Sequence, residues 1–276
     1  MNVPYAEVIG DPIAHSKSPL IHKFWLEALR LEGDYRAFRV HHNDLGAYFT
    51  ARRGDPDWRG CNVSLPHKIH AIRHLDDFTA EAVAVGAVNC VYRKGDRLVG
   101  ANTDVDGVDA VLDARPWRAN MVTIIGGGGA ARAVLEVLRR RDVLEVFMIV
   151  RDPGSVRPVH AAFVRSGGVH DFRDTDVAFA ACEYLINASP LGMAGAPAMP
   201  ASILGALGKV ARYATVFDMV YTPPETQLLT RARALSLATS TGIDMLVGQA
   251  RSAFRRFFGR EPPEGLDAEL IGRLTQ

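Results

Sequence analysis

Short apolar runs alternate along most of the chain with stretches in which apolar side chains recur every three or four residues. Short runs bounded by turn residues are typical of buried strands, and the longer spacing is typical of helices that pack on one face. In the first third of the chain we therefore predict strands at residues 5–10, 35–40 and 58–65, and helices at residues 19–31 and 44–53.

A second block of the same kind begins near Asn120. It opens with a strand at residues 121–125, a glycine turn and a helix at residues 130–141. A strand that runs through a glycine turn into a helix predicts a nucleotide-binding βαβ unit, here starting in mid-chain. Further strands are predicted at residues 144–150, 184–189 and 214–220.

The remaining patterns decide the domain organisation. Residues 89–102, with Lys-Gly-Asp at their middle, predict a hairpin, and the chain from about Thr239 onward reads as helical with a long apolar face. The fold class predicted is α/β with mainly parallel strands, in two domains separated by a cleft. One domain would combine residues 1–106 with residues 240–276, and a Rossmann-like domain of residues 107–239 would be inserted between them.

Composition narrows the class of function. The 276 residues include 32 Lys and Arg against 31 Asp and Glu, so the net charge of +1 gives no electrostatic reason to expect nucleic acid as a partner. No apolar run approaches the length of a membrane span, and the N-terminus has no secretory pattern. Cys61, Cys90 and Cys182 are scattered without metal-ligand spacing, so we expect no metal site and a cytoplasmic location.

The glycine turn fits a dinucleotide site. Gly126, Gly127, Gly128, Gly129, Ala130 and Ala131 satisfy G-x-G-x-x-A between a strand and a helix. Gly126 would permit the tight turn, Gly128 would let the backbone approach a pyrophosphate, and Ala131 would allow close helix–strand packing. Free N–H groups at the helix N-terminus would then meet the phosphates. Such turns also occur without a ligand, so the flanking strand and helix carry the prediction.

The residues after the next strand should meet the adenosine ribose. They are Arg151 and Asp152. An arginine there pairs with the 2′-phosphate of NADP, whereas a carboxylate accepts the 2′-hydroxyl of NAD. An exposed loop ion pair is the structural alternative. NADP is favoured, and use of NAD stays open.

Ketone reduction by a nicotinamide needs a proton donor for the developing alkoxide, and a positioned lysine can supply it. Lys68 is a candidate in the segment Asn-Val-Ser-Leu-Pro-His-Lys. Ser64 before Pro66 could instead cap a helix, which would make Lys68 a solvated helix residue. Spacing alone favours this helix.

Other polar residues carry the same ambiguity. Ser18 and Pro19 suit a helix start, whereas Ser16 has no such structural reason. Asp104 follows a strand and could be a helix cap. Gln249 falls on an apolar helix face, where a buried amide needs hydrogen-bond partners from either a polyhydroxylated ligand or the backbone.

In order along the chain, these segments resemble the shikimate dehydrogenase family. The matching segments are VIGDPIAHSKSPLIH, GCNVSLPHK, GAVNC, GANTDVDG, GGGGAARA, INASPLGM, DMVYTPPETQLL and GIDMLVGQARSAF. Each alone is only suggestive, but the ordered set covers nearly the whole chain and is highly specific.

The resemblance implies NADP-dependent reduction of 3-dehydroshikimate to shikimate, with a role for each matching residue. Lys68 would be the catalytic acid/base and Asp104 its partner. The substrate would be bound by Ser16 and Ser18 at its carboxylate, helped by Tyr221, and by Ser64, Asn89 and Gln249 at its ring hydroxyls. The cofactor would be held by Gly126 to Ala130 at the pyrophosphate, Arg151 at the 2′-phosphate, and Met219 and Gly242 at the nicotinamide end.

Some departures from the family pattern leave alternatives open. Val150-Arg151-Asp152 stands where the family has Asn-Arg-Thr, which adds a negative charge near a phosphate site and makes dual use of NAD plausible. A quinate or dual quinate/shikimate dehydrogenase, or a non-catalytic ligand sensor, would use the same fold. The hydroxyl of Ser18 favours shikimate, and the presence of Lys68 and Asp104 favours an enzyme. A monomer or a homodimer is expected.

Overall fold

The computed structural model describes residues 3–115 and 119–276 of the chain. The chain divides into two compact units, one formed by Met1–Gly107 with Leu246–Gln276 and the other by Val108–Met245. Both passages of the chain from one unit to the other fall inside helices, namely α4 (Asp104–Asp113) and α10 (Gly242–Phe258).

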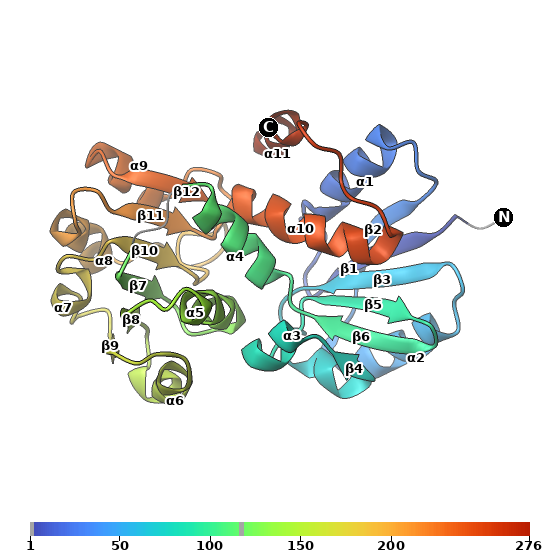
Figure 1. The fold of residues 1–276 in the computed structure, drawn as a ribbon, viewed down its shortest axis with the longest axis horizontal. Coiled ribbons are helices and arrows are strands. Elements are labelled where there is room, and N and C mark those ends of the chain that lie inside the picture. Colours follow the sequence, from blue (N-terminus) through green and yellow to red (C-terminus); the bar gives the residue numbers. More distant parts are fainter. Residues whose placement is uncertain (1–2, 116–118) are drawn as a thin grey trace. The chain divides into compact units, whose positions relative to one another are not determined.

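The first unit is built on a mixed six-stranded sheet in the order β2-β1-β3-β5-β6-β4 (Figure 1). β1 pairs in parallel with β2 and β3, whereas β5 is antiparallel to both β3 and β6. The short β4 pairs in parallel with β6. The strands are β1 (Tyr5–Gly10), β2 (Asp34–Arg39), β3 (Trp58–Val63), β4 (Asp77–Phe78), β5 (Cys90–Lys94) and β6 (Arg97–Ala101).

Side chains alternate between two apolar clusters along β1. Tyr5 and Ile9 pack in one cluster with Phe49 of α2, whereas Ala6 and Val8 pack in another that includes Phe257 of α10. Both faces of this sheet are therefore covered, which explains why β1 is buried along its whole length. The other helices of this unit are α1 (Ser18–Ala28), η1 (His42–Asp44), α2 (Leu45–Arg53), η2 (His70–His74), α3 (Ala80–Val85) and α11 (Asp267–Thr275).

The C-terminal part of the chain completes this unit. Figure 1 shows α11, near the C-terminus, beside α1, and the two helices are in contact. Arg251 of α10 donates to the carboxylate of Asp267 at the start of α11, and the ammonium group of Lys17 donates to the carbonyl of Leu274 near its end. A cation at a helix C-terminus is favourable because the last carbonyl groups have no partner within the helix.

The second unit has a fully parallel six-stranded sheet in the order β12-β11-β10-β7-β8-β9. The order changes direction between β7 and β10, and ligands of open α/β sheets bind outside the carboxyl ends of the strands at such a point. The strands are β7 (Met121–Ile125), β8 (Glu145–Ile149), β9 (Gly167–His170), β10 (Tyr184–Asn187), β11 (Thr215–Asp218) and β12 (Ala238–Thr241). The helices are α5 (Gly129–Arg140), α6 (Pro153–Phe163), α7 (Asp176–Phe179), α8 (Ala201–Ala206), η3 (Leu207–Lys209) and α9 (Gln227–Ala234).

The predicted α/β class, with a Rossmann-like block in mid-chain, is confirmed, as are the predicted strands and helices within a few residues at their ends. The prediction of helix from Thr239 is wrong at its start, because residues up to Thr241 form β12. Helix α10 begins only at Gly242, where Thr241 and Asp244 cap each other: Thr241 N donates to Asp244 Oδ2 at 3.1 Å, and Asp244 N donates to Thr241 Oγ1 at 3.4 Å. β-Branched threonines favour the strand, and the reciprocal cap starts the helix after it.

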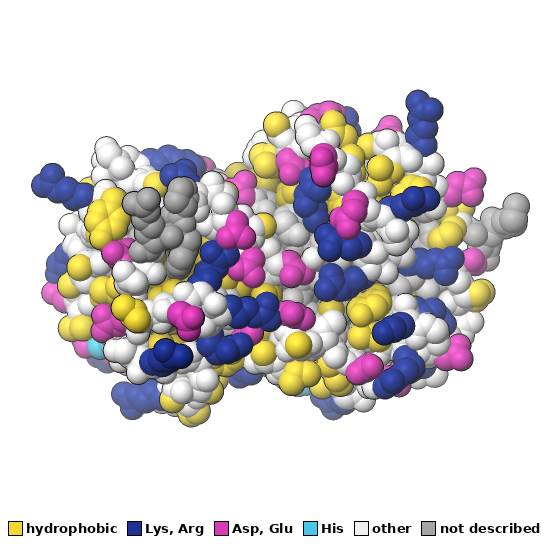
Figure 2. All heavy atoms as spheres, in the orientation of Figure 1, with side chains coloured by type: hydrophobic (Ala, Val, Ile, Leu, Met, Phe, Trp, Pro, Cys, Tyr) yellow, Lys and Arg dark blue, Asp and Glu magenta, His cyan; other side chains and the backbone are white. Residues whose placement is uncertain are grey.

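The surface is mixed in charge. Figure 2 shows basic and acidic side chains interspersed over the visible face of each unit, in line with the nearly balanced composition. Within residues 3–115 and 119–276, no helix is long and apolar enough to cross a membrane, and no group of three His, Cys, Asp or Glu side chains could hold a metal ion.

Candidate active site

Strand register brings distant parts of the first unit to one edge of its sheet. Ile9 lies opposite Val63, Asn62 opposite Cys90, and Cys90 opposite Ala101. The carboxyl ends of β1, β3 and β6 and the beginning of β5 therefore meet at the same edge. The loops that follow β1 and β3 touch there, since Asp11 N donates to the carbonyl of Leu65 at 3.1 Å.

Lys68 and Asp104 form an ion pair at this edge. Lys68 Nζ lies 2.5 Å from Asp104 Oδ2, and the two side chains are 20% and 9% exposed. Lys68 belongs to a turn between β3 and η2, and Asp104 is the first residue of α4. The alternative in which Ser64 and Pro66 start a helix with Lys68 on its solvated face is therefore wrong. Asp104 holds the ammonium group of Lys68, and two of its three N–H donors remain for a further partner.

Asn89 is buried and locked by its neighbours. Its Nδ2 donates to Asp104 Oδ1 at 2.8 Å and to Thr103 Oγ1 at 3.1 Å, while its Oδ1 accepts from Thr103 N at 2.6 Å. Both N–H donors of this amide are therefore used within the protein. Asn89 fixes the second carboxylate oxygen of Asp104, and its Oδ1, which also lies 3.2 Å from Thr103 Oγ1, is the only part of the amide that can serve a further partner, as an acceptor.

Gln249 of α10 joins the same network through Thr103. Its Oε1 accepts from Thr103 Oγ1 at 3.2 Å, and its Nε2 donates to the carbonyl of Leu246 at 3.0 Å. The buried amide thus has both a side-chain and a backbone partner, and one N–H donor is left over. Thr103 was not among the predicted site residues, although its place between Asn102 and Asp104 in the Asn-Thr-Asp segment was the available signal.

The three predicted serines lie at this edge, Ser16 and Ser64 in loops and Ser18 at the start of α1. Ser16 and Ser64 are half-buried and Ser18 is buried. Ser18 N donates to Ser16 Oγ at 3.3 Å, which leaves the Ser16 hydroxyl free to donate. Ser18 is the first residue of α1 and makes no side-chain cap, so the expected N-cap role is wrong by one position. The Ser18 hydroxyl is thus not used to cap α1.

In the second unit, the glycine turn follows β7 as predicted. Gly126 has a φ of +115°, and a Cβ there would lie 2.9 Å from the carbonyl oxygen of Ala188. A Cβ on Gly127 would lie 2.5 Å from Val156 Cγ2, whereas one on Gly128 would meet open space. The first two glycines are needed for packing. Gly128 leaves the backbone open toward solvent.

Helix α5 begins at Gly129 with Gly128 as its N-cap, and no side chain caps it. Its first N–H groups therefore have no partner from a capping side chain, which is the arrangement that binds a pyrophosphate at a helix N-terminus. The turn and the helix start fit a dinucleotide.

Arg151 and Asp152 follow β8 and are both exposed. Asp152 is the N-cap of α6, and its Oδ1 accepts from Gly154 N at 3.0 Å. In the described part of the chain no carboxylate forms an ion pair with Arg151, so the loop ion pair considered as the structural alternative does not form. The guanidinium group is available to an anion, while the carboxylate is committed to the helix start.

Met219 and Gly242 are neighbours at the carboxyl edge of the second sheet. A Cβ on Gly242 would lie 2.4 Å from the carbonyl oxygen of Met219, so only glycine lets the two segments approach this closely. Tyr221, two residues beyond Met219, is half-buried in the same loop. These positions, the glycine turn and Arg151 all follow strands of the same sheet.

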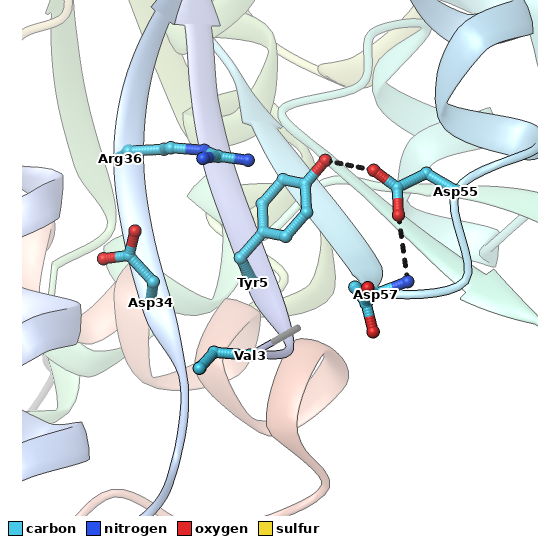
Figure 3. Close-up of a pocket in the computed structure, with 6 residues that line it drawn as sticks. All are labelled: Val3, Tyr5, Asp34, Arg36, Asp55 and Asp57. Atoms are coloured by element: carbon cyan, nitrogen blue, oxygen red, sulfur yellow. Dashed lines mark hydrogen bonds between the residues drawn. The ribbon is translucent and has the colours of Figure 1, made fainter. Parts of the chain in front are cut away.

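A separate surface pocket lies at the opposite end of the first sheet. Figure 3 shows Tyr5 and Arg36 beside three carboxylates, with Tyr5 Oη donating to Asp55 Oδ2 at 2.5 Å. The lining residues lie before β1, β2 and β3 or in the first three residues of these strands; they are Val3, Tyr5, Asp34, Arg36, Asp55 and Asp57. Lys68 and the serines follow the carboxyl ends, so this pocket is not part of the candidate site.

Comparison with known protein families matches two segments of the chain. Residues 8–91 match the model of the shikimate dehydrogenase substrate binding domain, and residues 242–269 match that of the shikimate 5′-dehydrogenase C-terminal domain. The first segment contains the serines, Lys68 and Asn89, and the second contains Gln249. Neither model covers the glycine turn.

Relatives extend the match over nearly the whole chain. A protein of Sphingopyxis alaskensis named shikimate dehydrogenase (NADP(+)) is 46% identical over 273 residues, covering 99% of this chain and 97% of its own. The crystal structure of shikimate 5-dehydrogenase from Thermus thermophilus, in complex with NADP(H) and shikimate, has 31% identity and a TM-score of 0.83, covering 98% of this chain and 99% of that one. Quinate dehydrogenase from Corynebacterium glutamicum, in complex with NAD, has 26% identity and a TM-score of 0.86, covering 98% and 99%. The agreement in sequence, order of segments and fold places the chain in the shikimate dehydrogenase family.

Proposed function

We propose that this chain is an NADP-dependent shikimate dehydrogenase, which reversibly reduces 3-dehydroshikimate to shikimate in the shikimate pathway of aromatic amino acid biosynthesis. The observation that carries the proposal is the Lys68–Asp104 pair, which sits among hydroxyl and amide groups at the carboxyl edge of the first sheet. A 46% identical relative bears the same name, and a structural neighbour binds NADP(H) and shikimate.

Lys68 is the proton donor in this mechanism. NADPH, when bound, supplies the hydride that reaches the carbonyl carbon. Lys68 Nζ gives a proton to the oxygen that becomes the hydroxyl group and takes it back in the oxidation direction. Asp104 holds Nζ at 2.5 Å, so the donor is oriented before the substrate arrives. Asn89 in turn fixes the other oxygen of Asp104.

The remaining polar groups bind the substrate. Ser16 and Ser18 would donate to its carboxylate with help from Tyr221, and Ser64 and Gln249 would bind ring hydroxyls. Gln249 keeps one N–H donor and Asn89 keeps only acceptor capacity, so Gln249 would donate and Asn89 would accept. A site that pairs each hydroxyl discriminates strongly, because a substrate lacking one leaves protein groups unpaired.

The second unit would hold the cofactor. Gly126 to Ala130 and the start of α5 would bind the pyrophosphate, and Arg151 the 2′-phosphate. Met219 and Gly242 would line the nicotinamide end. The functional division of the chain, with residues 1–106 and 240–276 for substrate and residues 107–239 for NADP, is part of the same proposal.

A cytoplasmic location and a monomeric or homodimeric state also belong to the proposal. Cell fractionation tests the first, and light scattering after size-exclusion chromatography tests the second.

Steady-state oxidation of shikimate and of quinate, each with NADP and with NAD, tests the activity. We expect strong turnover with shikimate and NADP. Turnover of quinate, or equal use of NAD, would instead favour a quinate or dual quinate/shikimate dehydrogenase; one structural neighbour is a quinate dehydrogenase in complex with NAD. Binding of shikimate without turnover of any pair would contradict the proposal and favour a sensor.

Replacement of Lys68 tests the mechanism. In Lys68→Ala we expect kcat to fall at least about 10²-fold, the lower range for general acid–base catalysis, with the dissociation constant for shikimate within about tenfold of wild type. Lys94→Ala, which removes an exposed lysine of the β5–β6 hairpin, is the control and should keep full activity. Near-wild-type turnover of Lys68→Ala would refute the assigned role.

A further inference from the structure

A fully buried carboxylate, Asp218, stands at the carboxyl end of β11 in the second unit. It accepts three hydrogen bonds: from Thr226 Oγ1 at 2.6 Å, from Asn187 Nδ2 at 2.8 Å and from Val220 N at 3.1 Å. Burial raises the pKa of Asp218, and these hydrogen bonds oppose the rise. No cation forms a salt bridge with it in the described part of the chain, so the three donors alone stabilise its charged form.

The three donors come from three different segments. Thr226 is the N-cap of α9, Val220 belongs to the loop after β11, and Asn187 ends β10. Asn187 extends the connection further, because its Oδ1 accepts from Ser189 Oγ at 2.6 Å and its Nδ2 donates to the carbonyl of Leu191 at 3.1 Å. Asp218 thus ties the loop after β10, the loop after β11 and the start of α9 together.

These loops are the ones that border the proposed cofactor site. A Cβ on Gly126 would lie 3.0 Å from Ser189 Cβ, so the loop after β10 packs directly against the glycine turn. A Cβ on Gly242 would lie 2.6 Å from the carbonyl oxygen of Val220, so the loop after β11 packs against the start of α10. Both contacts are too close for any side chain, and a small shift of either loop would alter the shape of this edge.

The strand order of the sheet indicates which half of a bound dinucleotide these loops would contact. The pyrophosphate binds at the turn after β7, and the adenosine half extends over β8, where Arg151 lies. The other half must extend across the switch point toward β10 and β11. Asp218 therefore lies beneath the half of the site that would receive the nicotinamide.

We propose that Asp218 is a positioning residue, which holds the loops after β10 and β11 in the arrangement that places the nicotinamide for hydride transfer. This inference rests on the proposed function and deepens it, since it concerns how the second unit presents its cofactor. Asp218 does not touch the reacting atoms; it acts through Asn187, Val220 and Thr226. Nothing in the proton-transfer role of Lys68 depends on it.

The test compares Asp218→Ala and Asp218→Asn with wild type. Alanine leaves the buried donors of Val220 and Thr226 unpaired, whereas asparagine can restore the network if Thr226 Oγ1 accepts instead of donating. We expect kcat for shikimate oxidation to fall at least about tenfold in Asp218→Ala and by less in Asp218→Asn, because misplacement of about 1 Å costs up to about 10²-fold in rate. The KM for shikimate should stay within about twofold.

A cofactor fragment separates positioning from general damage. Adenosine 2′,5′-bisphosphate reports only on the adenosine half of the site, so its inhibition constant should stay within about twofold in both variants. Thr123→Val is the matched control, since it removes another fully buried hydroxyl of the same unit, one that donates to the carbonyl of Ala178 away from these loops. It should lower the melting temperature and leave kcat unchanged.

Two results would overturn the inference. The first is that both variants fold and keep the kcat and the KM for NADP of wild type. The second is that adenosine 2′,5′-bisphosphate binds more weakly by the same factor as kcat falls. Should wild type itself fail to oxidise shikimate, the proposed function fails first. The Asp218 inference is then decided by equilibrium binding: Asp218→Ala should weaken NADP more than the fragment, and equal weakening would refute it.

Discussion

Acid should destabilise the first unit through one residue, His22 of α1. Its side chain is fully buried, neither ring nitrogen has a hydrogen-bond partner, and the ring stacks on Tyr35 with centroids 4.0 Å apart and planes at 2°. The rings of Phe254 and Trp25 also pack against His22, each with its centroid 5.8 Å from that of the imidazole. Desolvation by burial lowers the pKa of His22 from 6.5 to about 3. The folded protein therefore keeps this imidazole neutral.

The sign and size of the effect follow from this shift. Below pH 6.5 the unfolded chain binds a proton that the folded chain binds only near pH 3, so stability is complete above pH 6.5 and is lost as the pH falls. One proton changes the free energy of unfolding by about 1.4 kcal/mol per pH unit. Between pH 7.5 and pH 4.5 we expect His22 to remove between about 2 and 3 kcal/mol.

Urea denaturation at several pH values measures the effect. Trp25 and Trp58 are both buried in the first unit, so their fluorescence follows its unfolding, in a background with Trp117→Phe. His22→Phe keeps a ring against Tyr35 and removes the titration, and His22→Leu is a second comparison. The difference in unfolding free energy between wild type and variant should change with pH by the amount above, since other groups cancel. If the unfolding free energies of wild type and His22→Phe change with pH in parallel, to within about 0.5 kcal/mol, the reasoning is refuted.

Three further predictions concern the second unit. Arg151→Ala should raise the KM for NADP sharply and barely change the KM for NAD, because only NADP carries the 2′-phosphate. Asp152→Asn should lower the KM for NADP, since asparagine keeps the α6 cap and removes a negative charge. Initial rates with both cofactors decide the matter, and equal effects of Arg151→Ala on both would exclude a 2′-phosphate role. Gly242→Ala should destabilise the unit by about 1–3 kcal/mol and raise the KM for NADP, because its Cβ would lie 2.4 Å from Met219 O; an unchanged melting temperature would contradict this.

The elements and their order could be predicted from local sequence patterns. Strand and helix periodicities, and the glycine turn between β7 and α5, depend on residues close together in the chain, so they can be predicted without the three-dimensional structure. The ordered motifs likewise pointed to the family, and the comparisons confirmed it. Even the place of Lys68 in a matching segment was visible, but its surroundings were not.

The contacts of the polar residues could not be predicted in this way, because they depend on how distant segments pack. Spacing favoured a solvated helix for Lys68, yet it pairs with Asp104, 36 residues away, because the register of β3, β5 and β6 brings both to one edge. Gln249 meets Thr103 across 146 residues, and Asp218 meets Asn187 across 31. Hydrogen bonds between distant segments depend on sheet register and burial, which arise from packing of the whole unit and leave no periodic trace in the sequence.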